Sequence, residues 1–214
     1  FLSDENGCKN SAFNCCPSSG EALKNIEENV EKLAFLLKQK TSRYHLWTDD
    51  DLGADIRCRC EKCKDLSAFG QNSIICEAIT RGIKKYDEKA ENALLLYGEE
   101  PEFRDAPKNS FIEFAPFKRE HAIPLTKGKK NAFFADKLKK LISVYRADKV
   151  SVLEYFLSFD FNGFLRGDGA SRVEKDVEFY INAGVTDLTA FAVFAGASTE
   201  EKLDGIKKYF KILG

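Results

Sequence analysis

The sequence is unusual first for what it lacks. Its 214 residues include no Met, one Trp and two His, and it begins at Phe1, whereas average usage would give roughly five Met. We therefore expect a fragment or processed form, or a sequence from which methionine positions were lost. No apolar run approaches the ~20 residues of a membrane span, and no basic and then apolar leader is present.

The chain also lacks a large net charge of either sign. The chain has 33 basic and 34 acidic residues and a net charge of -1, so no global field attracts nucleic acid or anionic lipid. Its 43% hydrophobic and 31% charged residues are the balance of a protein that buries a core, which excludes disorder and fibres. We expect no nucleic-acid partner and no membrane span, and the oligomeric state is not predicted.

The chain has seven cysteines, too few for a disulfide scaffold of this length and odd in number, so at least one thiol is unpaired. This slightly favours a reducing, cytoplasmic compartment. A secreted or cell-envelope protein stays open.

Apolar periodicity predicts alternating helices and strands. Helices are expected where apolar residues recur every three or four positions: from Leu23 to Leu37, from Ile75 to Tyr86, from Phe134 to Tyr145, from Val173 to Tyr180 with Gly184 as the cap, and after the capping pair Ser198-Thr199. The short apolar runs 44–48, 93–97, 111–115, 150–156 and 188–194 predict buried strands.

Helices interleaved with buried strands predict an α/β fold with a mainly parallel sheet. A doubly wound sheet and a (β/α)8 TIM barrel both fit this order. Acidic and aromatic residues at carboxyl ends of strands, and the lack of a Gly-rich turn after any strand, favour the barrel. Because a complete barrel needs about 250 residues, we expect residues 1–214 to form a single α/β domain that holds only the later strands of a partial barrel.

Two carboxylates lie inside predicted strands with apolar neighbours on both sides, Glu113 and Glu154. An ionised carboxylate in a buried strand is costly unless it is paired or functional. Glycosidic cleavage requires two such groups, one as acid and one as nucleophile or base. Structural pairing with Arg or Lys is the alternative. The acidic run at Asp49 and Asp50 ends another strand beside Trp47 and is either a ligand site or a turn cap.

Aromatic side chains near strand ends are suited to stacking on pyranose rings. Trp47, Tyr97 and Tyr155 have this placement, although most of the 18 Phe must belong to the core. Arg119 and His121 follow the strand that bears Glu113, and together they could bind a sugar hydroxyl or carboxylate. The alternative for His121 is a solvated loop residue.

The densest motif is Cys58-x-Cys60-x-x-Cys63. Three thiolates at this spacing could share a tetrahedral Zn²⁺, with Cys76, His45 or His121 as the fourth ligand. No second spaced pair exists, so one disulfide with a free thiol, or reduced packing cysteines, are the alternatives. No cofactor is required, and structural zinc is the only candidate.

A second group of cysteines is the vicinal pair Cys15-Cys16, which precedes the first predicted helix. We expect this pair to pack locally or to partner Cys8.

Several motifs in order resemble a family of bacterial proteins first catalogued as a domain of unknown function. Some of its members form glycoside hydrolase family 163, endo-β-N-acetylglucosaminidases that act on complex N-glycans. The resemblance covers about residues 16–194 and rests on His45-Leu46-Trp47-Thr48-Asp49-Asp50, Cys58-Arg59-Cys60-Glu61-Lys62-Cys63, Phe111-Ile112-Glu113-Phe114-Ala115-Pro116 with Arg119 and His121, and Val152-Leu153-Glu154-Tyr155.

The resemblance implies a (β/α)8 catalytic barrel with two acidic catalytic residues and a retaining mechanism. On matching positions these acids come from Glu154, Glu113 and Asp50, with Asp49 beside the substrate. The sequence hypothesis is thus a retaining glycoside hydrolase for β-linked N-acetylglucosamine or a related glycan. The alternatives are a non-catalytic carbohydrate- or partner-binding domain, and a zinc-stabilised protein.

Overall fold

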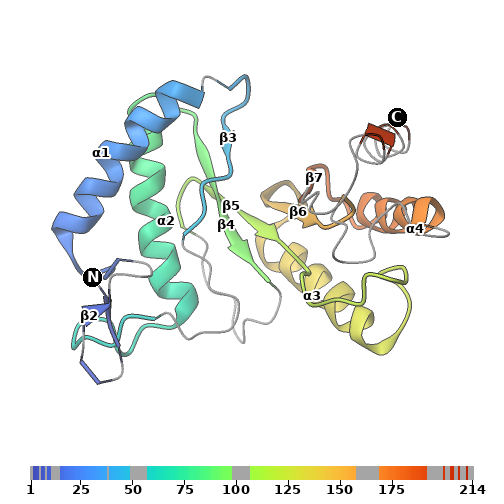
Figure 1. Cartoon of the computed structure of the whole chain (residues 1–214), viewed down its shortest axis with the longest axis horizontal. Coiled ribbons are helices and arrows are strands. Elements are labelled where there is room, and N and C mark those ends of the chain that lie inside the picture. Colours follow the sequence, from blue (N-terminus) through green and yellow to red (C-terminus); the bar gives the residue numbers. More distant parts are fainter. Residues whose placement is uncertain are drawn as a thin grey trace. The chain divides into compact units, whose positions relative to one another are not determined.

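The computed structural model divides into two compact units (Figure 1). The first unit contains Phe1–Leu95 and Glu100–Ile112, and the second contains Leu96–Glu99 and Glu113–Gly214. The structure describes residues 2–4, 6–7, 9–10, 15–37, 39–48, 57–97, 107–157 and 169–191, with residues 200, 203, 204, 207 and 211.

The first unit is built on two long helices that lie side by side, α1 and α2 (Figure 1). Its elements in chain order are β1 (Leu2–Ser3), β2 (Lys9–Asn10), α1 (Gly20–Leu37), β3 (Arg43–Tyr44) and α2 (Ala68–Lys84), and it shares β4 (Glu91–Leu96) and β5 (Ser110–Phe114) with the second unit. Strands β1 and β2 pair antiparallel.

The α1 and α2 faces that the apolar spacing predicted form one core. Ile75, Ile79 and Ile83 of α2 pack with Ala34 of α1, and partly buried α1 residues surround them. The side chain of Ser67 caps α2, accepting a hydrogen bond from the Gly70 amide at 3.1 Å. Both predicted helices are confirmed, although α2 ends two residues before Tyr86.

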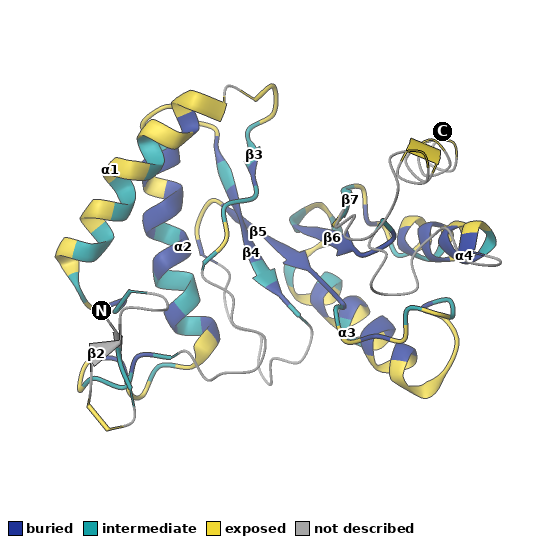
Figure 2. Cartoon of the chain, in the orientation of Figure 1, coloured by how far each residue is buried: buried dark blue, intermediate teal, exposed yellow. Residues whose placement is uncertain are grey.

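The other five strands, which include β6 (Val150–Glu154) and β7 (Leu188–Ala190), form one parallel sheet in the order β3-β4-β5-β6-β7. In β3 and β4, Arg43 pairs with Glu91, and in β6 and β7, Glu154 pairs with Ala190. All residues of β5 and of β6 (Val150–Glu154) are buried (Figure 2), which explains their continuous apolar runs. The sheet shows a mixed α/β fold that is compatible with a partial α/β barrel.

The second unit continues the alternation. Its further elements are α3 (Lys129–Tyr145), the short 3-10 helix η1 (Ala147–Lys149), β6, α4 (Gly169–Asn182) and β7 (Leu188–Ala190). Gly184, at φ +88°, follows the end of α4 as predicted, because a left-handed conformation there suits glycine. The end of the last predicted strand lies outside the described residues. The predicted closing helix after Thr199 also lies outside them, except for five isolated positions.

The other predicted helices and strands are confirmed, with bounds that differ by a few residues, except for the strand predicted over 44–48. Only Tyr44 of that run lies in a strand, the two-residue β3, and residues 45–48 continue without regular structure. The β1-β2 hairpin was not predicted. Within the described ranges, no helix has the length and apolarity that crossing a membrane requires.

Gly82 marks the place where the α1 and α2 backbones approach most tightly. A Cβ atom there would lie 2.6 Å from the carbonyl oxygen and 3.0 Å from the Cα of Glu27. Because backbone cannot yield as a side chain tip can, we expect Gly82→Ala to lower the free energy of unfolding by about 1–3 kcal/mol, despite the better helix propensity of Ala. Urea unfolding measures this.

Gly70 is the matched control in the same helix. Its added Cβ would meet only ordinary contacts, the nearest being Ser67 Oγ at 3.4 Å. Gly70→Ala should therefore be neutral or stabilise by up to about 1 kcal/mol. Equal effects of the two substitutions would contradict the close helix approach.

Candidate functional site

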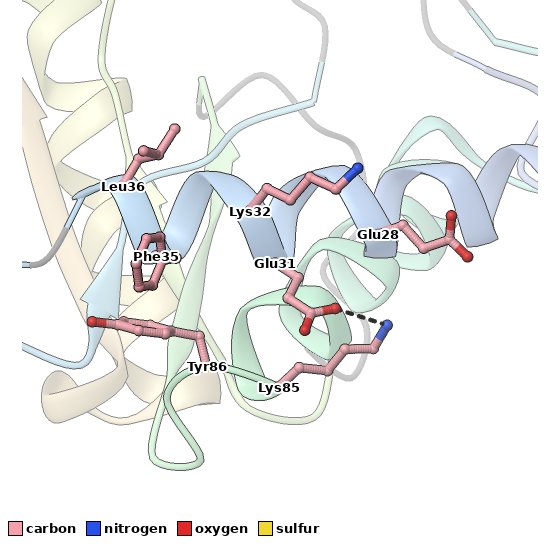
Figure 3. Close-up of a pocket in the computed structure, with 7 residues that line it drawn as sticks. All are labelled: Glu28, Glu31, Lys32, Phe35, Leu36, Lys85 and Tyr86. Carbon is pink, nitrogen blue, oxygen red and sulfur yellow. Dashed lines mark ion pairs between the residues drawn. The ribbon is translucent and has the colours of Figure 1, made fainter.

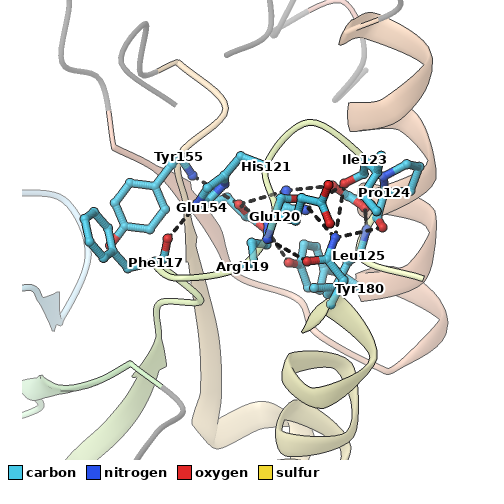
Figure 4. Close-up of polar contacts among 12 residues, drawn as sticks. Phe117, Arg119, Glu120, His121, Ile123, Pro124, Leu125, Glu154, Tyr155 and Tyr180 are labelled. Atoms are coloured by element: carbon cyan, nitrogen blue, oxygen red, sulfur yellow. Dashed lines mark hydrogen bonds and ion pairs between the residues drawn. The ribbon is translucent and has the colours of Figure 1, made fainter. Parts of the chain in front are cut away.

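A buried ion network stands at the carboxyl end of β6 (Figure 4). The Glu154 carboxylate is 0% exposed. Arg119 Nε lies 3.1 Å from its Oε1 and Arg119 Nη2 3.3 Å from its Oε2. The Tyr180 hydroxyl donates to Oε1, and the Tyr155 amide donates to Oε2 at 3.1 Å. Both carboxylate oxygens of Glu154 are therefore occupied by donors.

The same guanidinium holds a second buried carboxylate. Arg119 Nη2 lies 2.8 Å from Asp176 Oδ2, and the Leu125 amide donates to Asp176 Oδ1. Burial raises the pKa of Asp176 to about 6, with Arg119 lowering it and Glu154 raising it. Burial, followed by the nearby Glu154 charge, also raises the pKa of Tyr180 well above its usual value. One cation thus serves two carboxylates, and Tyr180 stays a hydrogen-bond donor.

Glu113 and Glu154 lie on opposite faces of the sheet. Thr189 Oγ1 donates to Glu113 Oε1 at 3.2 Å, and Thr189 is in register with Leu153. Residues in register share a face, and successive residues alternate. Glu154 therefore points to the other face, where its partner Tyr180 is supplied by α4. The two carboxylates do not converge on one point.

Aromatic rings follow the carboxyl ends of four strands, β4 to β7. Tyr97 contacts Phe117 at 6.2 Å between ring centroids, Phe117 contacts Tyr155 at 5.3 Å, and Tyr155 contacts Phe191 at 5.6 Å. We call Tyr97, Phe117, Tyr155 and Phe191 the aromatic row. Phe191 is 38% exposed while Tyr155 is only 6% exposed, so the row runs from the interior to the surface. Carboxyl ends of parallel strands are where α/β proteins bind ligands.

His121 joins the aromatic row, with its ring 5.6 Å from that of Tyr155. Its Nε2 lies 2.7 Å from the Phe117 carbonyl oxygen. A carbonyl only accepts, so Nε2 carries the proton. Burial, and then the positive charge of Arg119, lower the pKa of His121. His121 is therefore neutral at pH 7, which leaves Nδ1 as an acceptor.

Four cysteines of the first unit gather in one place and could hold a metal ion. The Sγ atoms of Cys16, Cys58, Cys60 and Cys63 all lie within 4.8 Å of one another. Cys16 Sγ is 3.8 Å from those of Cys60 and Cys63. For a tetrahedral ion with metal–sulfur bonds of about 2.3 Å, the sulfur–sulfur separation is about 3.8 Å. We call these four residues the four-cysteine cluster.

The fourth member of this cluster differs from the predicted candidates. Cys76 instead lies in α2, where its thiol reaches the Ala93 carbonyl at 3.7 Å. Cys16 was expected to pack locally or with Cys8, which lies outside the described residues. The six described cysteines are all free thiols, so among them the disulfide alternative is not realised.

Hydrogen bonds from neighbouring residues fix the backbone around the four-cysteine cluster. The buried amide of Gln71 accepts from the Cys58 amide at 2.8 Å and donates to the Cys58 and Cys63 carbonyls, each at 3.0 Å. The Ser3 amide approaches Cys58 Sγ at 3.4 Å. Burial raises the pKa of Cys60, but hydrogen bonds from Ser18 and Cys63 outweigh it and lower the value to about 6. One thiolate is therefore present at neutral pH, as metal binding requires.

The net pKa shift of Cys63 is opposite to that of Cys60, because burial is the largest effect on Cys63 and prevails there. Burial raises the pKa of that thiol to about 12. The cluster therefore keeps protons that a bound cation would displace.

A groove in the first unit is lined by α1 and the end of α2 (Figure 3). The rings of Phe35 and Tyr86 meet edge to face there, and Glu31 pairs with Lys85 at 3.4 Å. None of the predicted site residues lines this groove. We assign it no function.

The predicted site residues are thus distributed unevenly. Arg119, His121, Tyr97, Tyr155 and Glu154 come together at the strand ends of the second unit, and Glu113 lies in β5. Asp49 and Asp50 lie outside the described residues. Trp47 follows β3 in the first unit and is 36% exposed.

Several residues of these sites were missed by the sequence analysis. They are Asp176, Tyr180, Cys16, Gln71 and Phe191. The helical spacing placed Tyr180 in the core, and a polar Asp176 on that same buried face was the available signal.

Comparison with family models, curated proteins and solved structures found no match to this chain.

The raised pKa of Asp176 predicts how stability depends on pH. Its folded pKa of about 6 exceeds the ordinary value of 3.8, so the folded state binds the extra proton and stability falls as pH rises between these values. Asp176→Asn removes this titration. We expect the free energy of unfolding of the unmodified protein, relative to the variant, to fall by on the order of 1 kcal/mol per pH unit between pH 4 and 6.

Urea unfolding at a series of pH values measures this difference. If the free energy of unfolding varied with pH in the same way for the two proteins, the shifted pKa of Asp176 would be contradicted.

Proposed function

We propose that the chain is a barrel-type glycoside hydrolase that binds its glycan at the strand ends of the second unit. The observation that carries the proposal is the aromatic row, whose four rings each follow a different parallel strand. Aromatic faces bind the apolar faces of sugar rings. Phe191 gives the row an exposed end.

The opposite faces of Glu113 and Glu154 bear on the catalytic assignment. Two carboxylates that act on one glycosidic bond must face the same sugar, about 5 to 5.5 Å apart for retention. We therefore assign the catalytic role to Glu113, and to Glu154 the role of positioning Arg119 and Tyr155. The resemblance offers Asp50 as the second acid.

The proposal also includes the finer fold. A parallel sheet whose strands lie in chain order, with helices between them, is the arrangement of a (β/α)8 barrel, whereas a doubly wound sheet reverses its strand order at a switch point. The order β3-β4-β5-β6-β7 has no such reversal. It supports five units of a TIM barrel.

A non-catalytic carbohydrate-binding domain is the second candidate. The observation in its favour is the complete burial of Glu154 with all of its partners supplied. Such a domain would keep the aromatic row and release no reducing ends.

Substitution of Glu113 separates the two candidates. On N-acetylglucosamine-containing glycans, release of reducing ends by the Glu113→Gln variant should fall about 100-fold or more, while glycan binding persists. Glu120→Gln is the control, since Glu120 is an exposed acid in the neighbouring loop. Glu154→Gln should instead lower the stability, because its amide would present a donor to Arg119.

Undiminished turnover by Glu113→Gln would overturn the catalytic assignment. Glycan binding by the unmodified protein without any release would favour the binding domain.

We further propose that the four-cysteine cluster binds one structural Zn²⁺. Sulfur–sulfur separations of 3.8 Å match a tetrahedral zinc thiolate. Four protein ligands leave no open position for substrate, so the ion would tie Cys16, ahead of α1, to the loop ahead of α2.

Metal analysis tests the zinc proposal. We expect one Zn²⁺ per chain, a lower melting temperature after chelation, and recovery when zinc is returned. Cys16→Ser should lose most of the zinc affinity. Cys15→Ser is the matched control, because Cys15 is its neighbour and packs against the α1-α2 core instead. Equal zinc binding by both variants would contradict the assignment of Cys16.

A further inference from the structure

Asn131 is a fully buried amide in the first turn of α3. Its Oδ1 accepts a hydrogen bond from the Glu120 amide at 2.7 Å. Its Nδ2 lies 3.0 Å from the carbonyl oxygens of Glu120 and Pro124 and 3.3 Å from that of Ile123. One side chain therefore contacts four backbone groups of a single loop, and the Ile123 carbonyl also accepts from Arg119 Nη1 at 3.3 Å.

That loop, residues 117–125, carries three residues of the strand-end site, Phe117, Arg119 and His121. It has no helix or strand of its own, so its buried backbone groups depend on other partners. Arg119 anchors it to Glu154 and Asp176, and the Leu125 amide anchors it to Asp176. The Asn131 contacts lie between these anchors (Figure 4 shows the loop).

We infer that Asn131 is a positioning residue of the strand-end site, whose amide fixes the loop backbone and thereby places the His121 ring beside Tyr155. The importance of this placement for a ligand rests on the proposed function. The placement itself does not, because every contact in it is internal to the second unit.

Only an amide meets the requirements of this position. The Glu120 amide requires an acceptor, and the three carbonyls require a donor. A carboxylate lacks the donor, and an apolar side chain lacks both. Buried backbone groups left without a partner are costly, so without Asn131 the loop should move toward water.

The two histidines of the chain make this movement measurable. Their ring resonances can be followed by NMR over pH, with His121→Gln assigning each signal. The groups that act on His121 include Arg119, Glu154 and Arg172, along with its own burial, which lowers its pKa. In Asn131→Leu we expect the His121 signals to shift and its pKa to rise toward the ordinary value, while His45 is unchanged.

Leu138→Val is the control for a general loss of stability. Leu138 is fully buried in the same helix, two turns beyond Asn131, and its truncation should leave the His121 titration where it was. A folded Asn131→Leu protein with an unchanged His121 titration would overturn the inference. Asn131→Ser, which keeps a small polar group, serves if the Leu variant does not fold.

The unmodified protein supplies an independent test that needs no variant. The Glu120 amide should exchange with solvent at least roughly tenfold more slowly than an open loop amide. Fast exchange there would overturn the inference even if both variants failed to fold. Failure of glycan binding or hydrolysis would leave these results intact, so the two proposals fail separately.

Discussion

The second unit depends on one buried guanidinium. Arg119 reaches from the loop after β5 to Glu154 on β6 and to Asp176 on α4, and so joins three elements. Desolvation of three charged groups is costly, and removing one partner of a buried pair typically costs about 3–5 kcal/mol. Burial and the neighbouring Glu154 carboxylate disfavour the ionised form of Asp176, which its raised pKa reflects. The strand-end loops take their places from this network.

Strand alternation limits what the buried carboxylates can do together. Glu113 and Glu154 look equivalent in the sequence, each in an apolar strand, but the register of β6 and β7 turns them to opposite faces. Glu154 is surrounded by donors from a helix and a loop, as a structural group would be. Glu113 shares its face with Thr189. The surroundings of Glu154 therefore fit a structural role, and the proposed catalytic role falls to Glu113.

The sequence predicted what depends on periodicity and little of what depends on distant contacts. Apolar spacing identified α1, α2, α3 and α4, and apolar runs identified the strands, because burial of a face is a local property of the chain. The cysteine motif indicated a metal site. Its fourth member, Cys16, is more than forty residues away and is brought close by the packing of α1 on α2. No spacing rule could have found it.

The two loops that carry the candidate sites are each hydrogen-bonded to a buried side-chain amide of the helix that follows. Gln71 lies in the first turn of α2 and Asn131 in the first turn of α3, and each is a buried amide that bonds the backbone of the loop before its helix. Side chains in a helix point toward its N-terminus, so a first-turn amide faces the preceding loop. A buried Asn or Gln at the start of a helix is thus a sequence signal for a loop of fixed shape. In this chain both loops lack helix or strand, and the two amides supply partners for backbone groups of the loop before each helix.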